Sequence, residues 1–244
     1  MAIIGDIPPD QRDRAAAPLP GIRPVGQADW ITVDASYAAQ MAARRRLLKE
    51  QREAVYQMRP AAEGPAAELL QEVLVLLRAR PGFTVEEAAV VCPDGQRVAL
   101  DSAPPLVVLG QILQEDLCVH VAQGDAHHLM GAVLCFPASW TLAEKIGKPL
   151  VRIHAPVADY DAALAARVQR LFDGVQVGQP LWRANYLVYE DPTLFQPRRE
   201  GDQRPISSET SRYARSERQT VLRLPQSRAV VFAIHTVVAE IGPL

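Results

Sequence analysis

Two apolar runs joined by a tight turn constrain the fold of this chain more than any other feature. Residues 117–123 alternate apolar and polar side chains, Gly124-Asp125 has the composition of a turn, and residues 129–136 return as a second apolar run. This pattern predicts an antiparallel hairpin. His127 and His128 lie near its turn. Because adjacent strand residues face opposite ways, these two histidines cannot easily bind one metal ion.

Helical periodicity dominates the chain before this hairpin, and strand-like runs dominate after it. Pro93-Asp94-Gly95 lies between two short apolar runs and is typical of a hairpin turn. Pro104-Pro105 suits the start of a helix. The expected elements are helices over 37–58, 66–78, 106–114 and 161–172, hairpins over 88–100, 117–136 and 218–238, and a strand over 181–189.

Helices followed by about five antiparallel strands, with further helices between them, are typical of an α+β fold in which helices cover one side of a sheet. The chain lacks the regular strand–helix alternation of a doubly wound nucleotide-binding fold. Residues 1–20 are rich in Pro, Ala and Asp without periodicity, so we expect a flexible N-terminal arm there. We expect residues 21–244 to form a single domain.

Charge and motifs exclude several classes of function. The formal net charge of −2 gives no global field that favours nucleic acid or a membrane surface. Phosphate-binding, dinucleotide-binding and nucleophile-elbow motifs are absent, as is the CxxCH motif that attaches haem covalently. Haem that is not attached through cysteines needs only one axial histidine and an apolar slot, so the sequence does not exclude binding of haem in this form. We expect Arg44-Arg45-Arg46 to lie on a solvated helix face.

No signal peptide and no long uncharged apolar run is evident, so a reducing cytoplasm is the expected location. The three cysteines lack CxxC spacing, and Cys118 and Cys135, which lie in apolar strand-like runs, are expected to be buried thiols. The pattern leaves the oligomeric state open, and a homo-oligomer is compatible with it.

The stretch WTLAEKIGKPLVRIH, from Trp140 to His154, predicts a short helix followed by a second buried run. Thr141 and Glu144 have the spacing of a capping box. Lys145 is expected to be a solvated helix residue. His154 precedes Ala155-Pro156, where the chain must leave any helix. An imidazole held there is suited to bind a ligand or carry a proton, and the alternative is a core histidine bonded to a backbone carbonyl.

Four runs of the sequence agree with one known family in order and spacing. They are EDLCVH from Glu115, VLCFPASWTLAEKIGKPLVRIHAPVADYD from Val133, PLWRANYLVYEDP from Pro180 and RSERQTVLRLPQSRAVVFAIHTVV from Arg215. Together they resemble the haem-dependent oxidative N-demethylase family, and the resemblance covers most of the chain from Gly21 to Val238.

This resemblance implies a PAS-like domain, a sheet with flanking helices that binds haem b. It also implies oxidation of small methylated amines such as dimethylamine by dioxygen. Hydroxylation of the N-methyl carbon gives a carbinolamine, which collapses to formaldehyde and the smaller amine. Electrons come from NAD(P)H through a separate reductase with flavin and an iron–sulfur cluster. The alternative is a non-catalytic haem-binding or sensor protein on the same scaffold, and the plainest possibility is an α+β protein without haem.

The resemblance also suggests site residues. His154 is the expected axial ligand of the haem iron. Arg183 and Asn185 alternate along a strand and so share a face, where they are candidates to contact a haem propionate or dioxygen and to act in catalysis. A surface ion pair is the alternative for Arg183. Arg218 and Gln219 are weaker candidates for propionate contact or for polar pairing between strands.

Two aromatic residues and a second histidine complete the candidates. Phe136 and Trp140 are expected to wall the haem slot, with a plain core position as the alternative. His235 occupies a strand position where the family carries Arg, and it is the second choice of iron ligand.

Overall fold

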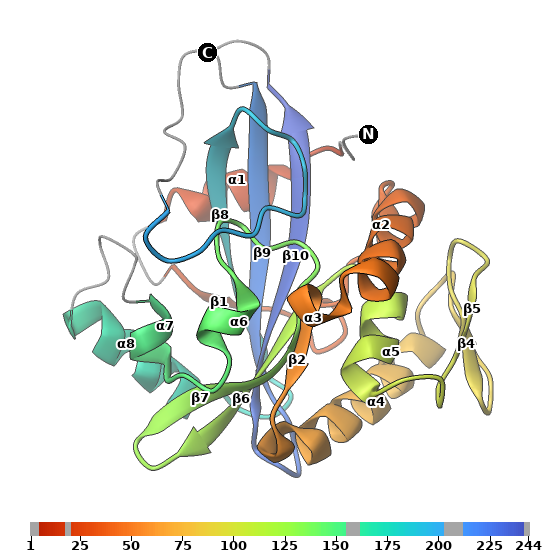
Figure 1. Cartoon of the computed structure of the whole chain (residues 1–244), viewed down its shortest axis with the longest axis horizontal. Coiled ribbons are helices and arrows are strands. Elements are labelled where there is room, and N and C mark those ends of the chain that lie inside the picture. Colours follow the sequence, from red (N-terminus) through yellow and green to blue (C-terminus); the bar gives the residue numbers. More distant parts are fainter. Residues whose placement is uncertain (1–4, 18–20, 155–161, 203–211, 242–244) are drawn as a thin grey trace.

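A computed structural model of the protein describes residues 5–17, 21–154, 162–202 and 212–241. A large antiparallel sheet lies at the centre of the molecule (Figure 1). Within these residues the sheet has seven strands in the order β1-β8-β9-β10-β6-β7-β2. The strands are β1 (Arg23–Pro24), β2 (Tyr56–Met58), β6 (Asp116–Gln123), β7 (Ala126–Val133), β8 (Leu181–Tyr189), β9 (Tyr213–Arg223) and β10 (Val230–Glu240). A separate three-stranded sheet contains β3 (Thr84–Val85), β4 (Ala89–Val91) and β5 (Arg97–Ala99).

Helices pack on both faces of the large sheet. In Figure 1, α6, α7 and α8 lie on the left, α2, α4 and α5 lie on the right with the small sheet, and α1 lies behind β8 to β10. The main core fills the space between α2, α4, α5 and the strands β6, β7 and β10. The helices are α1 (Pro9–Ala15), α2 (Tyr37–Glu50), α3 (Arg52–Val55), α4 (Glu63–Arg78), α5 (Pro105–Ile112), α6 (Leu142–Lys145), α7 (Leu150–His154) and α8 (Ala162–Gly174), with one 3-10 turn, η1 (Pro60–Ala62).

The two faces of β8 to β10 carry different side chains, because successive strand residues point to opposite sides. We call one side the Arg183 face; it carries Arg183 of β8 and Gln219 of β9, which are direct cross-strand partners. We call the other the His235 face; it carries His235 of β10 and its cross-strand partner Arg218. Apolar clusters beneath α6, α7 and α8 lie on the Arg183 face, and α1 covers part of the His235 face.

The α+β class is confirmed, but the expected PAS-like sheet of about five strands is wrong in strand number. The two additional strands of the large sheet are the short edge strands β1 and β2. β1 comes from a segment without strand periodicity. β2 was expected to be the end of a long helix over 37–58, which in fact ends at Glu50. Pairing of Tyr56–Met58 with β7 covers that edge, and this gain outweighs local helical periodicity.

Two further segments differ from the expectations. Residues 150–153, expected to be a buried extended run, form α7, in which the amides of Arg152 and Ile153 donate to the Pro149 carbonyl at 2.9 and 3.0 Å. Residues 9–15, expected to lack regular structure, form α1 next to β8 and β9. In both cases contacts with distant residues stabilise a helix that is too short to be stable alone.

A buried ion pair joins α2 to the sheet. The Arg44 guanidinium, fully buried, lies 2.7 Å from Asp116 Oδ1 at the start of β6. It also donates to the backbone carbonyls of Gly110, Gln114 and Glu115 at 2.8–3.2 Å. The expectation of a solvated arginine cluster is therefore wrong for Arg44, whereas Arg46 on the same helix is exposed. Its burial was not predictable from helical periodicity, because the partner carboxylate lies far away in the sequence.

We predict that Arg44→Met lowers the free energy of unfolding by about 3–5 kcal/mol, because it leaves the Asp116 carboxylate buried without its cation. The matched control is Arg46→Met, which removes an exposed arginine from the same helix and should change stability by no more than about 0.5 kcal/mol. Urea unfolding of the three proteins measures both values. Equal effects of the two substitutions would contradict the role of the buried pair.

Candidate functional site

Four polar side chains form a ladder on the Arg183 face. Arg183 lies opposite Gln219, and Asn185 lies opposite Glu217, in the register of β8 and β9. Arg183 Nη1 donates to Gln219 Oε1 at 3.1 Å, and Gln219 Nε2 donates to Glu217 Oε2 at 3.1 Å. Asn185 Nδ2 donates to Glu217 Oε2 at 2.9 Å, while the Glu217 amide donates back to Asn185 Oδ1 at 2.9 Å. Arg183 and Asn185 therefore share a face, as strand alternation predicts.

Arg183 lacks a direct counter-charge among the described residues. Its guanidinium is half-buried, and its Nε–H has no hydrogen-bond partner within the described part of the chain. Burial lowers the pKa of Arg183, and the negative charge of Glu217 opposes this shift. A desolvated guanidinium with a free N–H is suited to bind a carboxylate of a ligand. The alternative of a surface ion pair for Arg183 has no partner within the described residues.

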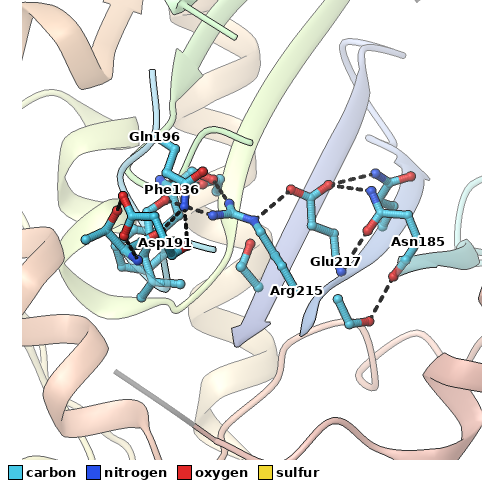
Figure 2. A network of polar contacts seen from close by, with 12 residues as sticks. Phe136, Asn185, Asp191, Gln196, Arg215 and Glu217 are labelled. Atoms are coloured by element: carbon cyan, nitrogen blue, oxygen red, sulfur yellow. Dashed lines mark hydrogen bonds and ion pairs between the residues drawn. The ribbon is translucent and has the colours of Figure 1, made fainter. Parts of the chain in front are cut away.

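Arg215 connects the ladder to two loops (Figure 2). Only 2% of its surface is exposed, and its Nε lies 3.6 Å from Glu217 Oε1. Its other nitrogens donate to the Phe136 carbonyl at 2.6 Å and to the Leu194 carbonyl at 3.0 Å. The loop after β7 and the loop after β8 are thus fixed against β9. In Figure 2 the Arg215 side chain lies between Glu217 and the loop residues Phe136, Asp191 and Gln196.

Sequence reasoning missed Glu217 and Arg215. Residues 215, 217 and 219 follow one another at intervals of two along β9. Arg215 and Glu217 therefore share a face with Gln219. That spacing was the available signal. Only Arg218 and Gln219 of this strand were predicted from the sequence as site residues.

His154 is the last residue of α7, so its backbone lies beside the Arg183 face, while its side chain and residues 155–161 fall outside the described part of the chain. Trp140 and Ile153 of the same region pack against the cluster of Cys118, Leu129 and their neighbours beneath α6. The structure therefore brings Trp140 and the end of α7 to one side of the sheet.

Phe136 lies differently from the wall position expected for it. Its ring is buried in the main core, with the Arg44 guanidinium 5.3 Å from the ring centre. Only its carbonyl, through Arg215, takes part in the network near the ladder.

Arg218 and His235 lie on the His235 face, across the sheet from Arg183. The Arg218 guanidinium stacks 5.0 Å from the centre of the Trp182 ring. Burial lowers the pKa of Arg218, and Glu115 opposes this shift. His235 is almost fully buried, with Nε2 3.4 Å from Asp34 Oδ2. These two residues cannot contact the same ligand as Arg183 and Gln219 without passing through the sheet.

Carboxylates surround His235. Burial alone would raise the pKa of Asp34, but the hydrogen bond and charge of His235, with hydrogen bonds from Ser36 and Gln114, hold it below its ordinary value. Burial raises the pKa of Glu115, whose Oε1 accepts a hydrogen bond from the Thr32 amide at 2.6 Å. This arrangement is an electrostatic network within the core.

The described residues contain no group of three or more His, Cys, Asp or Glu side chains that is arranged to hold a bare metal ion. None of the described helices is long and apolar enough to cross a membrane. The polar ladder with the desolvated Arg183, on the side of the sheet that α7 covers, is the candidate site, and the Arg183 guanidinium fits an anionic group of a ligand.

Comparisons with known proteins agree with the sequence resemblance. A family model described as "Haem-dependent oxidative N-demethylase, alpha subunit-like" matches residues 21–244. No curated protein matches the chain.

We predict that Asp34→Asn destabilises the protein by about 1–3 kcal/mol at pH 7, because a charged hydrogen-bond acceptor is lost. The folded-state pKa of Asp34 is lowered, so its contribution is present above the ordinary pKa of about 3.9 and is lost as the pH falls through the folded-state value. The stability difference should therefore shrink from pH 7 to pH 3.

Denaturant unfolding across this pH range measures the effect. Asp101→Asn, at an exposed turn, is the matched control and should have little effect at any pH. A difference between wild type and Asp34→Asn that does not depend on pH would contradict the lowered pKa of Asp34.

Proposed function

The chain belongs to the haem-dependent oxidative N-demethylase, alpha subunit-like family, and from this premise we propose that it binds haem b on the Arg183 face and demethylates a small methylated amine such as dimethylamine. The family description implies an oxidoreductase that depends on haem and works with other subunits. The observation that supports this site most strongly is the half-buried Arg183 guanidinium with its unpartnered Nε–H, on a polar ladder on the side of the sheet that α7 covers.

Each residue of the proposed site has a separate role. His154 would hold the haem iron through a nitrogen of its imidazole. Arg183 and Gln219 bind a propionate, because a desolvated guanidinium forms strong charge-assisted hydrogen bonds with carboxylates. Trp140 packs beside α7 and walls the haem slot. Phe136, Arg218 and His235 have no role in this proposal, since the Phe136 ring lies in the main core and the other two lie on the His235 face.

Asn185 and Glu217 face the substrate in this proposal. A methylated amine is a cation at neutral pH, and Glu217 presents a buried carboxylate at the centre of the ladder. Asn185 bonds both the carboxylate and the backbone of Glu217 and so fixes its orientation. Asn185 is the candidate to orient dioxygen, because it lies on the same face as Arg183 and Gln219.

Bound haem supplies the activation of dioxygen that allows hydroxylation of an N-methyl carbon. The overall step consumes one dioxygen, two electrons and two protons, and releases water. The carbinolamine product then breaks its C–N bond to give formaldehyde and the smaller amine. We propose that the electrons come from NAD(P)H through a separate reductase that carries flavin and an iron–sulfur cluster. The sequence contains neither the phosphate-binding nor the dinucleotide-binding motif, which agrees with this division.

We predict that the protein purified after expression with a haem supply shows a strong Soret band near about 400 nm, and that His154→Ala shifts or abolishes it. His235→Ala is the matched control, and its Soret band should stay unchanged because His235 lies on the other face. A wild-type protein without a Soret band would refute both the enzyme and the haem-sensor hypotheses. A band lost in His235→Ala but kept in His154→Ala would move the ligand to the other face.

We predict that the haem-loaded protein, supplied with NAD(P)H and the reductase, releases formaldehyde from dimethylamine. Glu217→Gln should raise KM for the amine about tenfold or more, equivalent to about 1.4 kcal/mol of lost charge attraction. Glu240→Gln, at the exposed end of β10, is the matched control and should leave KM unchanged.

Formaldehyde analysis and steady-state kinetics measure both effects. Stable haem binding without formaldehyde from any small methylated amine would favour a non-catalytic haem-binding or sensor protein. An unchanged KM in Glu217→Gln would exclude this carboxylate as the amine site.

A further inference from the structure

The helices α6 and α7 are too short to hold their own positions. They contain four and five residues, whereas isolated helices need roughly 12–15 residues for even marginal stability. The capping box expected for α6 does not form, since the Thr141 side chain makes no cap. Other contacts must therefore position the turn that ends on His154.

Lys145 makes one of these contacts. It was expected to be solvated, yet only 7% of its surface is exposed. Its Nζ donates a short hydrogen bond to the backbone carbonyl of Ile153, the residue that precedes His154. The last carbonyls of a helix have no partner within the helix, and a cation there also complements the helix dipole. Burial lowers the pKa of Lys145, and the charge and hydrogen bond of Glu200 oppose this shift.

Glu200 connects the same turn to the loop after β8. One of its oxygens lies 3.6 Å from Lys145 Nζ. Both oxygens accept hydrogen bonds from the Arg152 guanidinium of α7, at 2.7 and 3.1 Å. A single carboxylate thus contacts the last residue of α6 and the middle of α7.

The backbone of the same loop is attached to α6. The Glu200 amide donates to Glu144 Oε2 at 2.9 Å, and the Thr141 hydroxyl donates to the Arg198 carbonyl at 2.7 Å. The two side chains expected to cap the helix therefore bind residues 198–200. The loop continues back to Gln196, whose carbonyl accepts a hydrogen bond from the Ser139 amide at 3.0 Å. Residues 196–200 form a strap, which we call the 196–200 strap, across α6 and α7.

We propose that Lys145 is a positioning residue for His154, and that Glu200 and the 196–200 strap hold Lys145 and α7 in place for that purpose. The inference rests on the proposed function, in which His154 binds the haem iron. Lys145 acts only through the backbone: it fixes the carbonyl next to His154 and so restricts the directions in which the imidazole can leave α7. Loss of that bond should leave the ligand present but poorly oriented, which weakens iron coordination without removing the haem slot.

The test compares haem release from four haem-loaded full-length proteins into an excess of a haem-scavenging apoprotein. Lys145→Met keeps the length of the side chain and removes the donor, so we expect haem release about tenfold faster than wild type and a Soret band altered toward that of His154→Ala. Lys145→Arg keeps a cationic donor and should recover part of the loss. Lys49→Met is the control, an exposed lysine at the end of α2, and should release haem at the wild-type rate.

Thermal unfolding of the apoproteins separates positioning from simple stabilisation. If Lys145→Met lowers the apoprotein Tm but keeps the wild-type haem spectrum and release rate, Lys145 only stabilises the fold and the proposal is overturned. If Lys145→Met does not fold, Glu200→Gln replaces it, because Glu200 is a quarter exposed and loss of its charge costs the fold less than a change at the buried Lys145. We expect haem release about threefold faster from Glu200→Gln, and an unchanged rate would overturn the proposal.

The outcomes distinguish this inference from the proposed function. Wild-type haem binding through His154, with no effect of Lys145→Met on spectrum or release, overturns the positioning role and leaves the proposed function standing. A wild-type protein that binds no haem overturns both.

Discussion

The carboxylate of Asp116 fixes the point at which the central strands meet the rest of the chain. It lies at the start of β6, bonds the buried Arg44 of α2, and accepts the amides of Cys135 and Phe136 just after β7 at 2.6 and 2.9 Å. A buried ion pair of this kind contributes little net stability compared with an apolar pair, but removal of one partner is costly. Its consequence here is geometric, because it directs the chain after β7 toward Trp140 and the short helices. The candidate site depends on that direction, since Arg215 then binds the Phe136 carbonyl from β9.

Strand alternation divides the polar residues between two purposes. On the His235 face, Asp34, Glu115, Arg218 and His235 are packed among α1, α2 and the main core, where they form internal contacts. On the Arg183 face, the ladder of Arg183, Gln219, Glu217 and Asn185 lies beyond the apolar cover of α6, α7 and α8. The buried Arg183 Nε–H has no partner among the described residues, and the same is true of Arg218 Nε on the His235 face. If β8 and β9 together shifted by one residue relative to β10, the ladder would move to the His235 face. The eleven-residue pairing of β9 with β10 opposes such a shift.

Local patterns predicted the elements whose stability is local. The hairpin of β6 and β7, the helices α4 and α5 and the strand β8 were all evident from periodicity and turn residues, as was the common face of Arg183 and Asn185. The failures share one physical cause, which is that the deciding partner is distant in the sequence. Arg44 is buried because it forms an ion pair with Asp116. Lys145 is buried because it contacts Glu200 and donates to the Ile153 carbonyl. Residues Tyr56–Met58 are extended because they pair with the edge of β7. Glu217 could have been found by applying alternation along β9.

The central claim is that haem binds on the Arg183 face, next to the end of α7. The most direct test is the position of iron in crystals of the haem-loaded protein, located by anomalous diffraction at the iron absorption edge. The account predicts one iron position on the face that carries Arg183 and Gln219, within bonding distance of the His154 imidazole. An iron position on the face that carries Arg218 and His235 would contradict it.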